Sequence, residues 1–229
     1  MKVDLPAKIQ TLINNIEGAD VIDNSLISEF VESSKLTMDD LEPYTTFDHD
    51  IKESYGRNLI YQNKNFRILL MSWSAGDFTA IHNHGFIEWG CVLCFGEAIH
   101  RLYEMKGDQL CLTQKGNFRN GEIATVCGDL THLMGNSGID NFTTLHIYGA
   151  NSKESPVSSN TKVYYPELQN QISTMGSAYL NMNRDLILSE KQFSNFSKEA
   201  ISDYYELVIP FYKRINKLPI LQEIKEALH

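Results

Sequence analysis

Two histidines separated by one residue are the first feature of this sequence that could do chemistry. His82 and His84 lie in the segment GDFTAIHNHGFIE, residues 76–88. In a β-strand the side chains at positions i and i+2 point to the same face, so both imidazoles could bind one metal ion. On its own, a His-x-His pair is more often a polar pairing on a surface or in a core.

A third histidine strengthens the metal interpretation. His132 follows a Gly-Asp turn in the segment GEIATVCGDLTHLMGN, residues 121–136, where Asn136 comes four positions later. This arrangement could bring one imidazole from another strand to the first pair. Three imidazoles suit zinc, iron, copper or nickel, and only geometry and open coordination positions separate these metals.

The elements that must position these histidines are predicted to be strands. From about residue 54 to residue 150, short segments rich in β-branched and aromatic residues alternate with Gly, Asn, Asp or Lys. The segments are 58–62, 66–73, 89–95, 97–103, 110–115, 123–126 and 142–148. About seven strands at this spacing indicate an antiparallel sandwich or barrel.

Helices are predicted on both sides of the strands. Residues 1–52 carry apolar residues at three- and four-residue steps, which indicates two or three modest helices. Residues 166–229 contain an amphipathic run over 197–207, and Pro210 and Pro219 are expected to divide this tail into shorter helical pieces. We therefore divide the chain into N-terminal helices, a strand-rich part over 53–165 that carries the site, and a C-terminal helical extension packed on it.

Composition limits the class of protein. The 229 residues suggest one domain, and 20 Lys+Arg against 29 Asp+Glu give a net charge of -9. This charge disfavours nucleic acids and anionic membrane surfaces as partners. Four cysteines do not form a disulfide framework, and the first residues lack the apolar stretch of a signal peptide. A cytoplasmic location is expected.

The two histidine segments resemble the two motifs of the cupin superfamily, and the chain is most similar to the cysteine dioxygenase family of thiol dioxygenases. The segment YGRNL, residues 55–59, stands where that family has Tyr-x-Arg-Asn-Leu. The segment TLHIY, residues 144–148, stands where it has Ser-x-His-x-Tyr. The resemblance covers about residues 25–165. It implies a mainly β fold, a cupin-type antiparallel β-barrel or jelly roll with flanking N- and C-terminal helices.

The resemblance also implies roles for particular side chains. The three histidines would hold Fe(II), and Arg57 and Tyr55 would bind the substrate, since a planar guanidinium suits a carboxylate. Thr144, His146 and Tyr148 alternate, so they share one side of their strand and could form a hydrogen-bonded relay. Tyr148 would stand beside the iron. The implied activity is an Fe(II)-dependent thiol dioxygenase that converts cysteine and O2 to cysteine sulfinate.

Four residues depart from the family pattern: Cys127 and Thr144 replace a proline and a serine tolerably, whereas Trp89 and Glu88 bear on the pocket and the metal. Counting from His84 without gaps, Trp89 takes the position where many animal members have a cysteine that is cross-linked to the active-site tyrosine. No thioether with Tyr148 is expected, Cys91 is only a remote alternative partner, and a large indole could reshape the pocket. Glu88 is a possible fourth metal ligand, as the first-motif glutamate is in many other cupins.

Several alternatives stay open. The substrate could be another small thiol such as 3-mercaptopropionate, or the chain could be a three-His-one-Glu oxygenase or isomerase, or a non-catalytic ligand-binding cupin. The expected partners are a small thiol and dioxygen, and the oligomeric state is open between monomer and homodimer. His49, His100 and His229 belong to no motif and are expected to be structural or on the surface. The C-terminal extension could cover the barrel mouth, form a dimer contact or simply pack.

Overall fold

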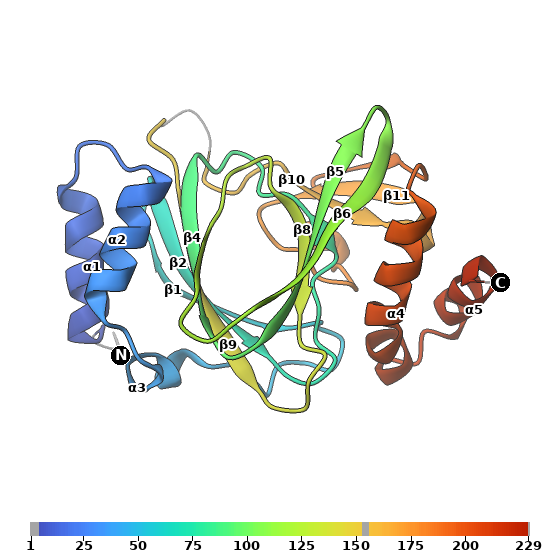
Figure 1. Ribbon diagram of the computed structural model, residues 1–229, viewed down its shortest axis with the longest axis horizontal. Helices are drawn as coiled ribbons and strands as arrows, with labels where there is room; N and C mark the ends of the chain where they lie inside the picture. The colour runs from blue at the N-terminus through green and yellow to red at the C-terminus, as the bar shows by residue number, and fades with distance from the viewer. Residues whose placement is uncertain (1–4, 153–155, 229) are drawn as a thin grey trace.

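Two antiparallel β-sheets form the centre of the computed structural model, which describes residues 5–152 and 156–228. Figure 1 shows helices from the N-terminal part on one side of the sheets and helices from the C-terminal part on the other. The prediction of a mainly β fold with flanking helices is confirmed. The two sheets stay separate, because no strand pairing within the described residues closes them into one barrel.

The five-stranded sheet carries the relay motif. Its strands, in spatial order, are β1 (Gly56–Gln62), β2 (Phe66–Trp73), β9 (Phe142–Gly149), β4 (Trp89–Phe95) and β7 (Ile123–Thr125). β2 and β9 are buried along their whole length. Both faces of these strands are covered, so their sequences read as continuous apolar runs rather than alternating ones.

The seven-stranded sheet carries the three histidines. Its strands are β12 (Ser189–Gln192), β11 (Asn170–Thr174), β10 (Thr161–Tyr165), β3 (Ile81–His82), β8 (Thr131–Gly135), β5 (Ala98–Lys106) and β6 (Gln109–Phe118). The register pairs His82 of β3 directly with His132 of β8. Residues that are directly opposite in an antiparallel pair share a face, so this pairing puts two imidazoles side by side.

The N-terminal helices cover the outer face of the five-stranded sheet. They are α1 (Ala7–Gly18), α2 (Asn24–Ser34) and α3 (Met38–Leu41), followed by the 3-10 turn η1 (Glu42–Tyr44). Asp23 caps α2 by accepting a hydrogen bond from the Leu26 amide, and Thr37 and Asp40 form a capping box at α3. The buried residues of α1 and α2 form one apolar cluster with residues of β2, β4 and β9, and α2 packs directly against β4 and β7.

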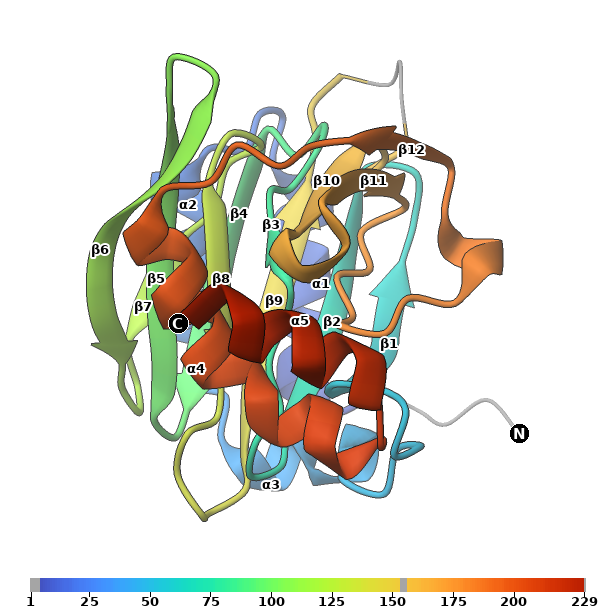
Figure 2. The same cartoon turned by 90° about the vertical axis from the view of Figure 1, so that its right-hand side faces the viewer.

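The C-terminal part covers the outer face of the seven-stranded sheet, as Figure 2 shows for α4 (Lys198–Arg214) and α5 (Leu218–Leu228). Two 3-10 turns, η2 (Pro166–Leu168) and η3 (Arg184–Leu186), precede them. The expected helix break at Pro210 is wrong, since α4 continues through it. Val208, Phe211 and Tyr212 are buried on both sides of the proline, and their packing offsets the lost backbone hydrogen bond.

Asp77 joins three distant parts of the chain. Its carboxylate is fully buried and accepts hydrogen bonds from His49 (Nε2–Oδ2 2.9 Å) and from Arg214 at the end of α4 (Nη2–Oδ1 2.7 Å). We call this group the Asp77 clamp. His49 was expected to be structural or on the surface, and the structure gives it a structural role. His229 lies outside the described residues.

Among the described helices, none has both the length and the apolar composition of a membrane span.

Candidate metal centre

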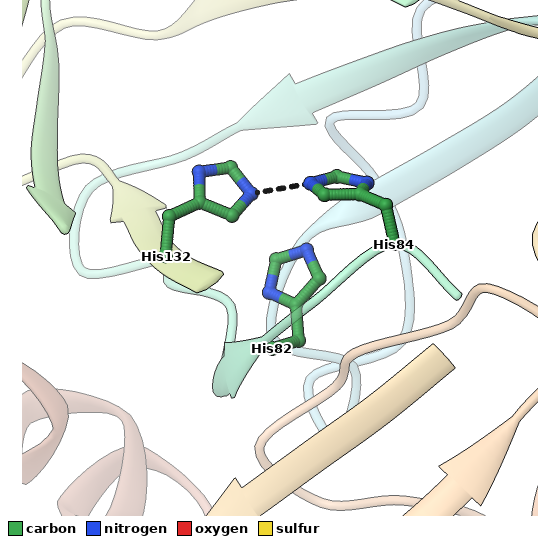
Figure 3. Close-up of side chains that lie close together, drawn as sticks. All are labelled: His82, His84 and His132. Atoms are coloured by element: carbon green, nitrogen blue, oxygen red, sulfur yellow. Dashed lines mark hydrogen bonds between the residues drawn. The ribbon is translucent and has the colours of Figure 1, made fainter. Parts of the chain in front are cut away.

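Three imidazoles meet between the sheets. His82 is the last residue of β3, His84 lies in the loop that follows, and His132 lies on β8. One nitrogen from each ring lies within 4.8 Å of the others, and Figure 3 shows the three side chains pointing toward one another. All three side chains are buried. The structure therefore brings together the three histidines that the sequence singled out.

The contacts around these rings place one nitrogen of each ring at the centre of the group. His82 donates from Nδ1 to the Ala80 carbonyl at 3.0 Å, which frees its Nε2. His132 contacts His100 through Nδ1, with 2.8 Å to His100 Nε2, and its own Nε2 lies 3.0 Å from Nε2 of His84. The expectation that His100 stands apart from the histidine motifs is wrong, because its ring contacts His132.

Burial keeps the three rings neutral. It lowers the pKa of His82 to about 4 and the pKa values of His84 and His132 well below their usual value, and neighbouring histidines add to the effect. Neutral imidazoles are the form that ligates metals. When one ion binds two nitrogens at about 2.1 Å each, with a nitrogen–ion–nitrogen angle of about 90°, the nitrogens stand about 3.0 Å apart. The Nε2 atoms of His84 and His132 have this separation. The donor set and spacing fit a divalent metal ion.

Glu88 does not join this group. Its exposed carboxylate accepts hydrogen bonds from the backbone amides of Asn151 (2.7 Å) and Ser152 (3.2 Å). These contacts tie it to the loop after β9 and lower its pKa, with the Ser152 side chain as the largest cause. The group of possible ligands among the described residues consists of imidazoles. The structure thus gives no support to Glu88 as a fourth ligand.

Trp89 faces away from the cavity. Its ring is buried beside Phe66, with 6.3 Å between ring centroids, in the core under the N-terminal helices. Gly90 is the residue opposite Tyr148 in the β4–β9 register, and a Cβ on Gly90 would lie 3.0 Å from Cδ1 of Tyr148. The expectation that the indole reshapes the pocket is therefore wrong. Counting without gaps misplaced the strand by one residue, and such a shift exchanges the two faces. Cys91 shares the outer face with Trp89.

A hydrogen-bonded chain runs along β9 toward the histidines. The Trp73 indole donates to Thr144 Oγ1 at 2.8 Å, Thr144 Oγ1 lies 2.7 Å from His146 Nε2, and His146 Nδ1 lies 2.5 Å from the Tyr148 hydroxyl. Trp73 can only donate, so the Thr144 hydroxyl accepts from the indole. The arrangement that leaves no buried hydroxyl proton without a partner is the one in which Thr144 donates to His146 Nε2. His146 Nδ1 then carries a proton and donates to Tyr148, whose own proton is free for the cavity.

The protonation states agree with this direction. Burial lowers the pKa of His146 to about 3, so its ring is neutral at pH 7 with one N–H. Burial also raises the pKa of Tyr148, so its phenol stays protonated. The centroids of the His84 and Tyr148 rings are 5.2 Å apart. A proton donor therefore stands beside the three imidazoles.

Arg57 and Tyr55 approach the same cavity from β1 and the residue before it. Arg57 pairs with Met71, which lines the cavity, so both lie on the inner face of the sheet. The positive charge of Arg57 lowers the pKa values of His146 and Tyr148, although burial is the larger effect on each. The Nε atom of Arg57 is buried and has no hydrogen-bond partner among the described residues. A planar cation without a partner is suited to an anionic ligand.

The cavity is small and has mixed walls. Its empty volume is about 410 Å³ including the opening to solvent. Its lining residues are Tyr55, Met71, Trp73, Thr79, His82, Asn83, His84, His132, Met134, His146, Tyr148, Ser158, Thr161 and Gly176. Gly176 belongs to the segment after β11, where Tyr179 also stacks on Tyr55 with 4.6 Å between centroids. The C-terminal extension thus supplies part of the cavity wall.

Two antiparallel sheets with a buried group of three histidines between them agree with the cupin class that the motifs indicated. Residues 1–169 match the model of the family described as cysteine dioxygenase type I, which is about three quarters of the chain. The chain belongs to this family.

Some solved structures are similar to this chain over part of its length. One is a protein with a double-stranded β-helix domain from Klebsiella pneumoniae, with 16% identity, a TM-score of 0.39 and coverage of 51% of this chain and 93% of that one. Another is a cupin superfamily protein from Desulfitobacterium hafniense, with 19% identity, a TM-score of 0.34 and coverage of 42% and 76%. Neither likeness bears on function.

Sequence reasoning missed three contributors to the site. His100 reaches His132 only because β5 and β8 pair, and that pairing has no local sequence signal. Trp73 lies on the inner face with Met71, but β2 is buried on both faces and its sequence shows no alternation. Gly176 arrives from a part of the chain outside the family match.

Proposed function

We propose that this protein is an Fe(II)-dependent thiol dioxygenase that adds both atoms of O2 to the sulfur of a small thiol, so that RSH and O2 give the sulfinic acid RSO2H. Conversion of cysteine to cysteine sulfinate is the reaction that the family suggests. The observation that carries the proposal is that the three imidazoles and the Tyr148 phenol border one buried cavity. Membership in the cysteine dioxygenase type I family supports it.

His82, His84 and His132 would hold the iron. Their shell is neutral, because burial keeps all three pKa values below the ordinary histidine range. When bound, Fe(II) would supply the redox chemistry for dioxygen and would favour the thiolate form of the substrate. The remaining work falls to the residues around the cavity.

Arg57 would bind the substrate carboxylate. Its guanidinium stays charged at any physiological pH and offers two parallel donors, which is the geometry of a bidentate carboxylate pair. Holding the carboxylate at one end and the sulfur at the other would fix the substrate in a single orientation. The Tyr55 ring, held by Tyr179 on one face and Trp73 on another, would form a wall beside it.

Tyr148 would hold a proton at its hydroxyl oxygen, ready to donate it to the oxygen-bearing end of the reactants. His146 occupies the other side of that oxygen at 2.5 Å, and Thr144 and Trp73 fix the ring of His146 in turn. Met71, Trp73 and Met134 provide apolar surface around the cavity, which limits access of water.

Two of the alternatives lose support. A three-His-one-Glu chemistry needs Glu88 at the metal, and its carboxylate is bonded to the loop after β9 instead. A non-catalytic binding protein has no need of a directed relay that ends on a protonated phenol. We also keep the division into residues 1–52, 53–165 and 166–229 as a proposal, with the addition that the third part lines the cavity through Gly176.

His132→Ala tests the proposal. It should abolish both iron binding and thiol-dependent oxygen uptake, measured by metal analysis and with an oxygen electrode. His49→Gln is the matched control, because His49 contacts Asp77 rather than the cavity. Undiminished oxygen uptake in the His132 variant would overturn the assignment.

A further inference from the structure

A second arginine, Arg67, lies beside two residues that line the cavity, Tyr148 and Gly176. Arg67 is on β2, directly opposite Tyr148 of β9 in the register. Residues opposite each other share a face, so Arg67 points to the inner side of the sheet, as Tyr148 does. Only 9% of its surface is exposed. Arginine is seldom buried to this degree unless it is paired.

Arg67 has almost no partners. Its Nη1 donates to the Met175 carbonyl at 3.4 Å, and its buried Nε has no hydrogen-bond partner among the described residues. No carboxylate of the described chain forms an ion pair with it. Carboxylates are plentiful in this sequence, which has 29 Asp+Glu against 20 Lys+Arg. A buried cation without a partner is costly, so this position favours an anion that the described part of the chain does not supply.

The guanidinium of Arg67 reaches the cavity wall. A Cβ built on Gly176 would lie 3.7 Å from Nη1 of Arg67, and Gly176 and Tyr148 both line the cavity. Arg57 lies on the same face of the sheet. Burial lowers the pKa of Arg67, and the charge of Arg57 adds to this, so the two cations lie within electrostatic reach of each other. Two carboxylates, one beside each guanidinium, would offset the burial of Arg67 and the repulsion between Arg57 and Arg67.

We propose, on the basis of the thiol dioxygenase assignment, that Arg67 binds a second carboxylate of the substrate. Arg57 would take one carboxylate and Arg67 the other, while the sulfur occupies the histidine end of the cavity. The preferred substrate is then a small thiol with two carboxylates rather than one.

Two other roles for Arg67 make different predictions. Arg67 could serve only to hold the Met175 carbonyl and thus the segment after β11. It could also share a single carboxylate with Arg57. In both cases, loss of Arg67 impairs thiols with one and with two carboxylates equally.

A pair of thiols that differ by one carboxylate separates these roles. Mercaptosuccinate is 3-mercaptopropionate with one added carboxylate, and oxygen uptake with each gives kcat/KM. The unaltered protein should prefer mercaptosuccinate at least tenfold. Arg67→Gln should lower kcat/KM for mercaptosuccinate about ten- to 100-fold, the effect of one charge-assisted contact, and change that for 3-mercaptopropionate less than about threefold. Arg184→Gln, at an exposed arginine, is the matched control. Equal losses with both thiols, or no preference in the unaltered protein, would overturn the proposal.

A binding measurement keeps this proposal separate from the proposed function. Succinate and propionate differ by one carboxylate and carry no thiol, so their effect on the thermal unfolding midpoint does not depend on turnover. Succinate should raise the midpoint more than propionate does, and Arg67→Gln should remove the difference. If this occurs without oxygen uptake on any thiol, the dioxygenase assignment fails and the second anion site stands. If uptake occurs and succinate has no advantage, the second anion site fails alone. Should Arg67→Gln not fold, the preference of the unaltered protein decides.

Discussion

His100 offers a sharp test of how the metal centre is built, because it touches a ligand without being one. Its Nε2 lies 2.8 Å from His132 Nδ1, so a His132 that binds a metal through Nε2 would carry its proton on Nδ1 and donate it to His100. The Nε2 atom of His132 faces His84. In His100→Phe the acceptor is gone. The Nδ1–H of His132 is then buried without a partner, or the proton moves to Nε2 and blocks the metal-binding nitrogen.

The expected cost follows from these two outcomes. A buried donor without an acceptor costs about 1–3 kcal/mol. Removal of such supporting partners lowers metal affinity about ten- to 100-fold. A tenfold change corresponds to about 1.4 kcal/mol, so the two figures agree. We therefore expect the dissociation constant for Fe(II) to rise about ten- to 100-fold in His100→Phe.

The affinity can be measured under anaerobic conditions by competition with a chromophoric chelator. His100→Gln is the conservative control, since its amide oxygen can accept from Nδ1 of His132 and should recover most of the affinity. If His100→Phe binds Fe(II) within twofold of the unaltered protein, the argument that His100 sets the His132 tautomer is refuted. Equal losses in both variants would refute it as well.

Three further predictions test the relay, the corrected strand register and a buried carboxyl. Thr144→Val removes the hydroxyl between Trp73 and His146, so kcat in the oxygen-uptake assay should fall about tenfold with KM unchanged; an unchanged kcat would contradict the relay. Trp89→Ala should lower the free energy of unfolding in urea by about 3–5 kcal/mol and leave KM unchanged, because the indole packs under the helices; a raised KM would put it at the cavity. Burial raises the pKa of Glu167 from 4.5 to about 7, so the folded state binds the proton of this carboxyl more tightly than the unfolded state does. The free energy of unfolding therefore falls by about 3 kcal/mol as the pH rises from 4.5 to 7. Glu167→Gln should flatten this pH dependence of the urea midpoint. If the variant and the unaltered protein show the same pH dependence, the buried Glu167 carboxyl is not its cause.

The parts of the site that could be predicted from the sequence lie close together in the chain. His82 and His84 are two positions apart, and Thr144, His146 and Tyr148 follow strict alternation on one strand. Alternation fixes which side chains share a face without any knowledge of the neighbouring strands. The structure places these residues around one cavity. The mainly β fold was predictable for the same reason, since the strand signals are short and local.

The parts that could not be predicted depend on pairing between distant segments. The face of Trp89 is set by the length of the connection after His84, where Gly85 adopts a φ of +60°, and a one-residue error inverts it. His100 and Gly176 reach the site through strand pairing and through a crossing segment. The continuation of α4 through Pro210 depends on tertiary packing, which overrides the local preference against proline inside a helix.

The Asp77 clamp has a consequence for the order in which the chain acquires its structure during synthesis. Asp77 and Arg214 are 137 residues apart, and the motif that contains Asp77 leaves the ribosome long before α4 does. Until then, the Asp77 carboxylate, which is fully buried in the finished fold, lacks one of its two side-chain partners, His49 and Arg214. The Gly176 wall of the cavity is also absent for part of that time. A contact between such distant residues closes a long loop, and the entropy lost in closing it opposes the contact before it stabilises the fold. Such contacts slow folding. We therefore expect the pocket of the nascent chain to stay incomplete until the segment that contains Gly176 has been released, and the Asp77 clamp to stay incomplete until α4 has been released.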